Sequence, residues 1–80
     1  MTENNVSNSE VIFMHIGQQL KKYVEGNYPN KSEFARIIGS SPQLLNSYFG
    51  RENLKYSTVK KIGACIGKEQ AELMAILEQQ

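Results

Sequence analysis

The fold is decided by a stretch in the middle of the chain, residues 34–48, which reads Phe34-Ala35-Arg36-Ile37-Ile38-Gly39-Ser40-Ser41-Pro42-Gln43-Leu44-Leu45-Asn46-Ser47-Tyr48. Two short helical patterns meet here at Gly39, a residue that ends helices readily. Ser41 is a favourable N-cap and Pro42 suits the first helical position, so a second helix is expected to begin at this point. Two short helices joined through a glycine predict a helix-turn-helix.

Helical periodicity continues on both sides of this stretch. Residues 10–25 are expected to form a long amphipathic helix, because apolar residues recur at every fourth position and Ser9 can act as its N-cap. Helices are also expected over residues 32–38, 41–49, 58–66 and 68–78, the fourth of these five capped by Ser57. No alternating apolar pattern of useful length indicates a strand. The predicted fold class is therefore all-α, with five helices.

The length of the chain limits its organisation. Its 80 residues support one domain, which we assign to residues 10–80, and the polar residues 1–9 are expected to form a disordered leader. Cys65 is expected to be a buried structural thiol beside Ile66. Tyr56 could either pack against Leu54 or hydrogen-bond a phosphate, and packing is slightly favoured. Apolar residues at helical spacing form the predicted core: Phe34, Leu45, Tyr48, Phe49, Val59, Ile62 and Ile66.

The residue types present argue against several functional classes. His15 and Cys65 are the only His and Cys, so the sequence predicts no metal site and no intrachain disulfide. No acidic pair, Gly-rich phosphate loop or Ser-His-Asp arrangement is recognisable, so we expect a non-enzymatic protein without a cofactor. The longest apolar run, residues 73–77, is far too short to span a membrane. These features predict a soluble, cytoplasmic protein.

The charge of the chain is unevenly distributed. The formal net charge is only +1, which argues at first against a nucleic-acid partner. Residues 21–61, however, hold eight Lys/Arg against three Glu, a balance of +5, while residues 1–20 and 62–80 each contribute −2. A local field attracts phosphate more directly than a net charge does. The sequence thus predicts a basic middle between acidic ends.

Residues 34–48 resemble the helix-turn-helix of the phage Cro and repressor (XRE-like) DNA-binding family. The resemblance rests on a small residue in the first helix (Ala35), a turn glycine (Gly39) and buried positions in the second helix (Leu45 and Tyr48). It extends more weakly over residues 16–67. It implies a lambda-repressor-like domain from a bacterial or phage setting, which regulates transcription, most simply as a repressor, by placing the helix of residues 41–49 in the major groove.

The same resemblance implies which side chains face DNA. The expected base contacts are Ser41, Gln43, Leu44, Asn46 and Ser47. The expected phosphate contacts are Lys31 and Ser32, at the start of the preceding helix, and Arg51, Asn53 and Lys55, in the loop after the recognition helix. Asn and Gln amides pair with adenine and leucine contacts the thymine methyl, so A·T positions are expected to be favoured.

Three features leave other functions open. Ser40 stands where the family usually has an apolar residue, Phe49-Gly50 replaces the usual helix ending, and the recognition helix holds no Lys or Arg. A helical protein-interaction module, or an antitoxin or controller protein with a protein partner, would fit the same scaffold. The family also implies a homodimer on double-stranded DNA. Its candidate surfaces are Val11 and Met14 or the last helix (Leu73, Met74, Ile76 and Leu77), although Leu73 and Leu77 could equally seal a monomer's core.

Overall fold

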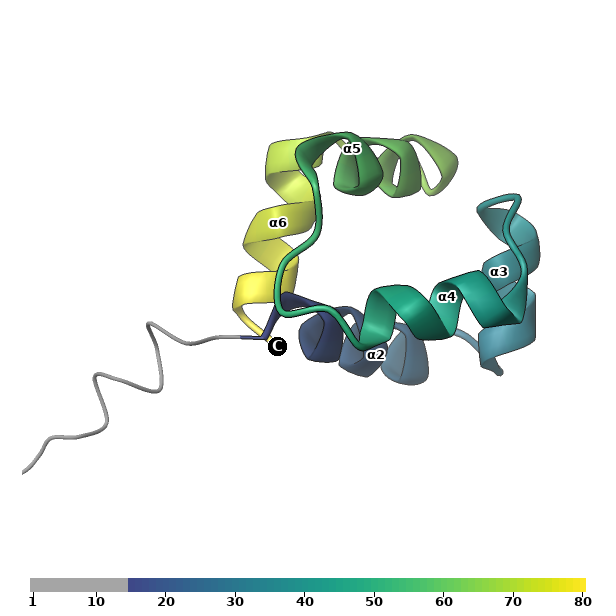
Figure 1. Ribbon diagram of the computed structural model, residues 1–80. Helices are drawn as coiled ribbons and strands as arrows, with labels where there is room; N and C mark the ends of the chain where they lie inside the picture. The colour runs from purple at the N-terminus through teal and green to yellow at the C-terminus, as the bar shows by residue number, and fades with distance from the viewer. Residues whose placement is uncertain (1–14) are drawn as a thin grey trace, which may run out of the picture.

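A computed structural model describes residues 15–80, and these form five α-helices without a strand among them. The helices are α2 (Ile16–Asn27), α3 (Lys31–Ile37), α4 (Pro42–Phe49), α5 (Tyr56–Cys65) and α6 (Gln70–Glu78) (Figure 1). The predicted all-α class is confirmed for this part of the chain. The predicted leader over residues 1–9 and the predicted helix start at residue 10 lie outside the described residues.

The first described helix does not extend back through His15, and it ends later than predicted. His15 has an extended backbone, and its Nδ1 accepts a hydrogen bond from the Gln18 N–H at 3.1 Å, so α2 starts at Ile16 and no single helix runs through from residue 10 to 25. The helix continues to Asn27 instead of ending at residue 25. It stops there because the residue before Pro29 is disfavoured in helical geometry, and Tyr28 accordingly has ψ 151°.

Side-chain caps define the starts of α3 and α4. Asn30 Oδ1 accepts from the Glu33 N–H at 2.8 Å, so α3 begins at Lys31, slightly before the predicted start at residue 32. Ser41 Oγ accepts from the Leu44 N–H at 3.2 Å, and Pro42 is the first helical residue, as predicted. Both caps satisfy N–H groups that have no partner inside the helix.

The two C-terminal helices start differently from the prediction. Lys55 is the N-cap of α5 and makes no side-chain cap hydrogen bond, so the predicted Ser57 cap is wrong and Ser57 lies inside the first turn. The chain then folds back after α5, where the Lys68 N–H donates to the Gly63 carbonyl at 2.8 Å. This turn delays α6, which starts at Gln70 and not at residue 68.

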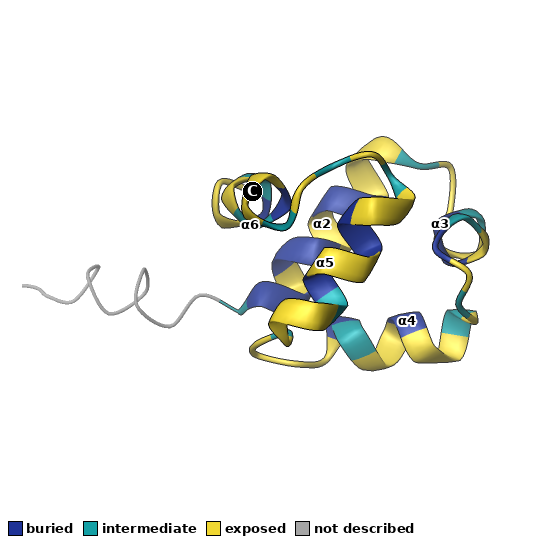
Figure 2. Cartoon of the chain, turned by 90° about the horizontal axis from the view of Figure 1, so that it is seen from above, coloured by how far each residue is buried: buried dark blue, intermediate teal, exposed yellow. Residues whose placement is uncertain are grey.

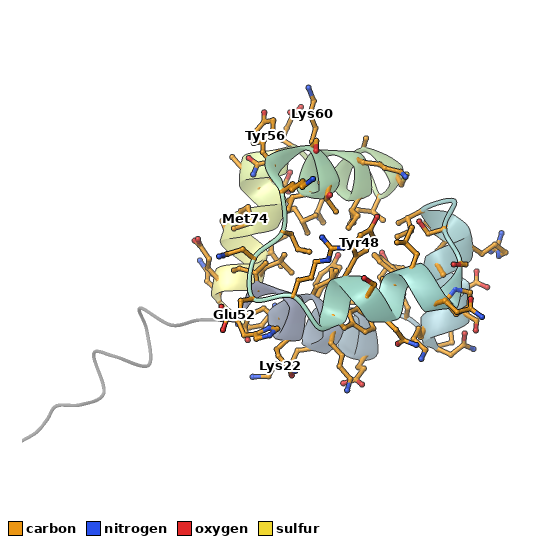
Figure 3. The ribbon with its side chains drawn as sticks, viewed as in Figure 1. Lys22, Tyr48, Glu52, Tyr56, Lys60 and Met74 are labelled. Atoms are coloured by element: carbon orange, nitrogen blue, oxygen red, sulfur yellow. The ribbon has the colours of Figure 1, made fainter. Side chains whose placement is uncertain are left out.

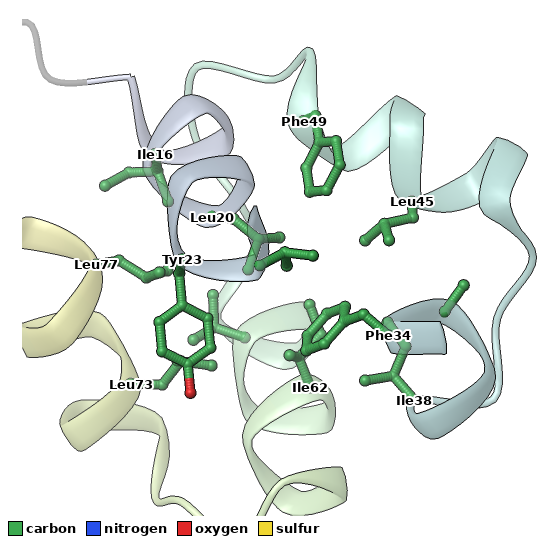
Figure 4. Packing of buried hydrophobic residues seen from close by; sticks show 13 residues of the cluster. Ile16, Leu20, Tyr23, Phe34, Ile38, Leu45, Phe49, Ile62, Leu73 and Leu77 are labelled. Carbon is green, nitrogen blue, oxygen red and sulfur yellow. The ribbon is translucent and has the colours of Figure 1, made fainter. Parts of the chain in front are cut away.

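The core lies between all five helices. Figure 4 shows Phe34 of α3 facing Ile62 of α5 and Leu45 of α4, with Leu20 of α2 behind them. Phe34, Leu45, Phe49, Val59 and Ile62 are buried as predicted, whereas Tyr48 and Ile66 are half-buried against this cluster.

Cys65 is exposed, which corrects the prediction of a buried thiol. The buried face of α5 runs through Val59, Ile62 and Gly63 and continues toward Ile66. Position 65 lies about 100° around the helix from position 66, so its side chain turns to solvent.

Helix α2 connects the two ends of the molecule. It packs against α3, α4 and α6, and Figures 1 and 2 show α3 and α6 at opposite ends of the bundle. The buried Gln19 side chain donates to the Leu77 carbonyl at 2.8 Å and to the Gln80 carbonyl at 3.2 Å, which joins α2 to the end of α6. The Leu77 carbonyl belongs to the last turn of α6, where carbonyls have no partner within the helix.

Helix α6 completes the core of the protomer. Leu73 and Leu77 are fully buried, and Met74 and Ile76 are half-buried against the same cluster. This supports the reading in which Leu73 and Leu77 seal a monomer's core, and it removes them as a dimer surface. The other candidate surface, Val11 and Met14, lies outside the described residues.

Candidate nucleic-acid interface

The turn between α3 and α4 sets the relation of these two helices. Gly39 has a φ of +69°, a left-handed conformation that glycine adopts without strain. The Ser40 N–H then donates to the Ala35 carbonyl at 2.8 Å, which satisfies a carbonyl of the last turn of α3. Ala35 is itself buried, and its small side chain fits where α3 packs on α4.

Helix α4 divides cleanly into an inner and an outer face. Leu45 and Phe49 point into the core, and Tyr48 lies half-buried beside them. The five predicted base contacts, by contrast, are all exposed, and we call them the α4 outer face: Ser41, Gln43, Leu44, Asn46 and Ser47. Leu44 is 39% exposed and is, with Tyr56, one of two large apolar side chains exposed within residues 15–80.

The start of α3 lies beside the α4 outer face. Lys31 and Ser32 are both exposed in the first turn of α3. Lys31 Nζ donates a hydrogen bond to Asn46 Oδ1 at 2.9 Å. The structure therefore joins one predicted phosphate contact to one predicted base contact, two residues that are fifteen positions apart in the sequence.

The loop of residues 50–55, between α4 and α5, is anchored through its backbone. The Ile16 N–H donates to the Glu52 carbonyl at 2.8 Å, and the Gly17 N–H donates to the Arg51 carbonyl at 3.0 Å. The first N–H groups of α2, which have no partners within that helix, thus hold the loop in place. The side chains of Arg51, Asn53 and Lys55 remain exposed on this anchored loop.

A close approach at Gly17 makes this anchoring possible. A Cβ atom at position 17 would lie 2.4 Å from the carbonyl oxygens of Tyr48 and Arg51 and 2.6 Å from that of Phe49. No other residue type therefore fits between the start of α2 and the end of α4. The sequence pattern did not reveal Gly17 as a key residue, because a glycine inside a helical pattern usually signals only a weak helix.

Ion pairs engage only some of the basic residues. Arg36 pairs with Glu33 in the next turn of α3, and this exposed pair raises the pKa of Arg36 and lowers the pKa of Glu33. Lys68 lies 3.8 Å from Glu72. Within residues 15–80, Lys31, Arg51 and Lys55 take part in no ion pair, so their charges stay available around α4.

A hollow of about 560 Å³ adjoins the α4 outer face. Helix α2, the turn before α3 and helix α4 contribute its walls, which include Lys21, Tyr28, Lys31 and Asn46. Burial, followed by the neighbouring Tyr23, raises the pKa of Tyr28 above its ordinary value. Tyr28 also contacts the Phe34 ring edge-on, with the ring centroids 4.8 Å apart.

Tyr56 differs from its prediction. It is 63% exposed at the first position of α5, so most of its surface faces solvent and not a packing partner. Figure 3 shows its side chain, like that of Lys60, pointing outward from α5 on the side away from α4. Tyr56 therefore adds an aromatic group to the surface and not to the core.

No group of three or more His, Cys, Asp or Glu side chains among the described residues is placed to hold a metal ion. No helix within residues 15–80 is long and apolar enough to cross a membrane.

The Ser40 hydroxyl is buried and has no hydrogen-bond partner among the described residues. A buried hydroxyl without a partner costs roughly 1–3 kcal/mol. Ser40→Ala removes this group and keeps the backbone bond to Ala35, so we expect the variant to gain about 1 kcal/mol in unfolding free energy. Urea denaturation followed by circular dichroism measures this gain. An unchanged or lower midpoint would show that the hydroxyl is satisfied.

Comparison with protein-family models, curated sequences and solved structures finds no match to this chain.

Proposed function

We propose that this chain is a sequence-specific DNA-binding regulator of transcription, most simply a repressor, in which α3 and α4 act as a helix-turn-helix of the XRE-like kind. The observation that carries the proposal is the α4 outer face. It is an exposed, mostly polar helix surface with cations on either side of it, Lys31 at the start of α3 and Arg51 and Lys55 in the following loop, which have no ion-pair partner within residues 15–80. An α-helix fits the major groove, where amide and hydroxyl side chains meet base edges.

The placement of the charged residues supports separate roles for α4, which would contact bases, and for the flanking cations, which would contact phosphates. Helix α4 has no Lys or Arg, so its own side chains suit base contacts better than phosphate contacts. The flanking cations can neutralise phosphates on both sides of the groove and set the orientation of the helix. The protein then needs neither a cofactor nor a catalytic group to act, because occupancy of an operator is sufficient.

A homodimer completes the proposal. One protomer offers few cations near α4, so we expect modest, salt-sensitive affinity for a single half-site. Two protomers would place two α4 helices about one turn of DNA, roughly 34 Å, apart on a palindromic site. Binding two half-sites together raises the overall affinity without any new type of contact.

One observation favours a different class of protein. Leu44 is exposed in the middle of the α4 outer face, and a large apolar side chain there would also suit a protein partner. On this alternative the scaffold is a helical interaction module. An antitoxin or controller protein, which binds a partner and its own promoter, would combine both functions.

An electrophoretic shift against random duplex pools, repeated at rising salt, separates these functions. A DNA-binding regulator retains duplex at low salt, loses affinity steeply as salt rises and enriches a sequence motif. A chain that retains no duplex even at low salt is not a DNA-binding regulator.

The phosphate contacts provide a more specific prediction. Arg51→Ala and Lys55→Ala are each expected to weaken binding to all sequences and to reduce the slope of log affinity against log salt by about one per protomer. The Arg51 carbonyl that accepts from Gly17 is kept, so the fold should be unchanged. Lys60→Ala is the matched control, because it removes the same charge from a side chain that points away from α4 (Figure 3). A change in base preference without a change in slope would contradict the phosphate assignment.

A further inference from the structure

The hydrogen bond between Lys31 and Asn46 fixes the orientation of the Asn46 amide. An ammonium group has three donors and no acceptor, so only the Oδ1 atom of the amide can face it. Oδ1 lies 2.9 Å from Lys31 Nζ, and both residues are exposed, so the bond forms on the surface that α4 presents to solvent. The Nδ2 group is left with both of its N–H donors free of any partner within the described residues.

The pair also changes the charge of the α4 outer face. Helix α4 has no cation of its own, but the Lys31 ammonium reaches its middle from the neighbouring helix. Lys31 keeps two further N–H donors after bonding to Asn46. The combined surface of Lys31 and Asn46 therefore offers several hydrogen-bond donors and a positive charge, and its one acceptor atom already accepts from the ammonium with one of its two lone pairs.

Guanine matches such a surface better than adenine or cytosine does. In the major groove guanine presents two neighbouring acceptors, N7 and O6. Adenine presents one acceptor and one donor, and its amino group would approach an oxygen that already binds an ammonium. Cytosine presents a donor, which a surface of donors repels.

We propose that Lys31 and Asn46 form one guanine-reading unit, in which Lys31 supplies the cation that α4 lacks and sets the polarity of the Asn46 amide. This inference rests on the proposed DNA-binding function. It replaces the phosphate role given to Lys31 under the proposed function and the expectation that Asn46 pairs with adenine. Arg51 and Lys55 remain the phosphate contacts, and Gln43 is left as the amide available for adenine.

Binding-site selection from a random duplex pool tests the pair. The wild-type chain is expected to select sites with a guanine at one position of each half-site. Lys31→Met and Asn46→Ala should both reduce preference for that same guanine, by roughly 5- to 100-fold. Lys31→Met should also increase acceptance of adenine there, because the freed Oδ1 can accept from its amino group. Lys60→Met, which loses the same charge on α5, should retain the wild-type motif.

Two outcomes would overturn the inference while DNA binding stands. In the first, Lys31→Met weakens all sites equally and keeps the motif, which would make Lys31 a phosphate contact. In the second, the position that Asn46→Ala affects is adenine in the wild-type motif. Failure of the wild-type chain to retain any duplex at low salt would overturn both the inference and the proposed function. Circular dichroism of each variant confirms that these surface substitutions leave the fold intact.

Discussion

Gly17→Ala is expected to lower the free energy of unfolding by about 3 kcal/mol, near the upper end of the usual cost of overpacking. The added Cβ would lie 2.4 Å from two backbone carbonyl oxygens and 2.6 Å from a third, at the end of α4 and in the loop that follows it. Backbone atoms cannot rotate away as a flexible side chain can. The start of α2 and the end of α4 must therefore separate, with loss of the bonds from Ile16 and Gly17 to the loop of residues 50–55.

Gly26→Ala is the matched control within the same helix. A Cβ atom at position 26 would meet nothing within 4 Å, so the substitution adds helix propensity without a clash. We expect it to leave the stability unchanged or to raise it by up to about 1 kcal/mol. Urea denaturation of both variants measures the difference, and equal midpoints would contradict the close packing of α2 on α4.

On the proposed function, Gly17→Ala should also affect DNA binding indirectly. The loop that carries Arg51 and Lys55 is held by the α2 backbone, so a displaced loop would move these cations relative to α4. Where the variant is still folded at low temperature, its affinity for DNA is expected to fall for all sequences alike.

Leu45→Ala is expected to cost 2–5 kcal/mol, a range typical of large-to-small substitutions at buried sites. Leu45 is 0% exposed and packs within the core cluster of the bundle. Its loss would leave a cavity between α3, α4 and α5, where Phe34 and Ile62 also meet (Figure 4). Because a small domain has only a few kcal/mol of stability, the variant should be partly unfolded at 37 °C.

Leu44→Ala, one position earlier, should behave in the opposite way. Leu44 is exposed on the α4 outer face, so its loss should change stability by less than about 0.5 kcal/mol. On the proposed function it should instead reduce binding to sites that present a thymine methyl to this position. Thermal denaturation and binding measured on both variants separate the roles. A large loss of stability in Leu44→Ala would contradict the division of α4 into two faces.

Local signals predicted the fold well where the determining atoms are close in sequence. Ser41 caps α4 through an N–H three residues away, and Pro42 starts the helix, so both could be read from the chain. The exposed and buried positions of α4 likewise follow from the helical period. The errors arose where packing or backbone geometry decides the outcome. Lys55 caps α5 without a side-chain bond, and Cys65 lies just off the buried face of that helix.

The candidate site was predictable in its residues but not in its connections. The outward positions of α4 could be listed from their spacing alone. The bond from Lys31 to Asn46 joins positions fifteen residues apart, and it depends on how closely α3 packs against α4. The need for glycine at position 17 depends on α2 meeting carbonyls more than thirty residues away. The periodicity of the sequence does not show how close Lys31 lies to Asn46 or how close Gly17 lies to these carbonyls.

The central claim is that the α4 outer face enters the major groove of DNA. The most direct measurement is a nuclear magnetic resonance titration of the full chain with its selected duplex, following the backbone amide signals. The account predicts that the largest shifts fall on Gln43, Leu44, Asn46 and Ser47, with smaller shifts at Lys31 and in the loop of residues 50–55. Signals from α6 should move little. Shifts that concentrate on α6, or that leave α4 unchanged at saturating duplex, would contradict the account.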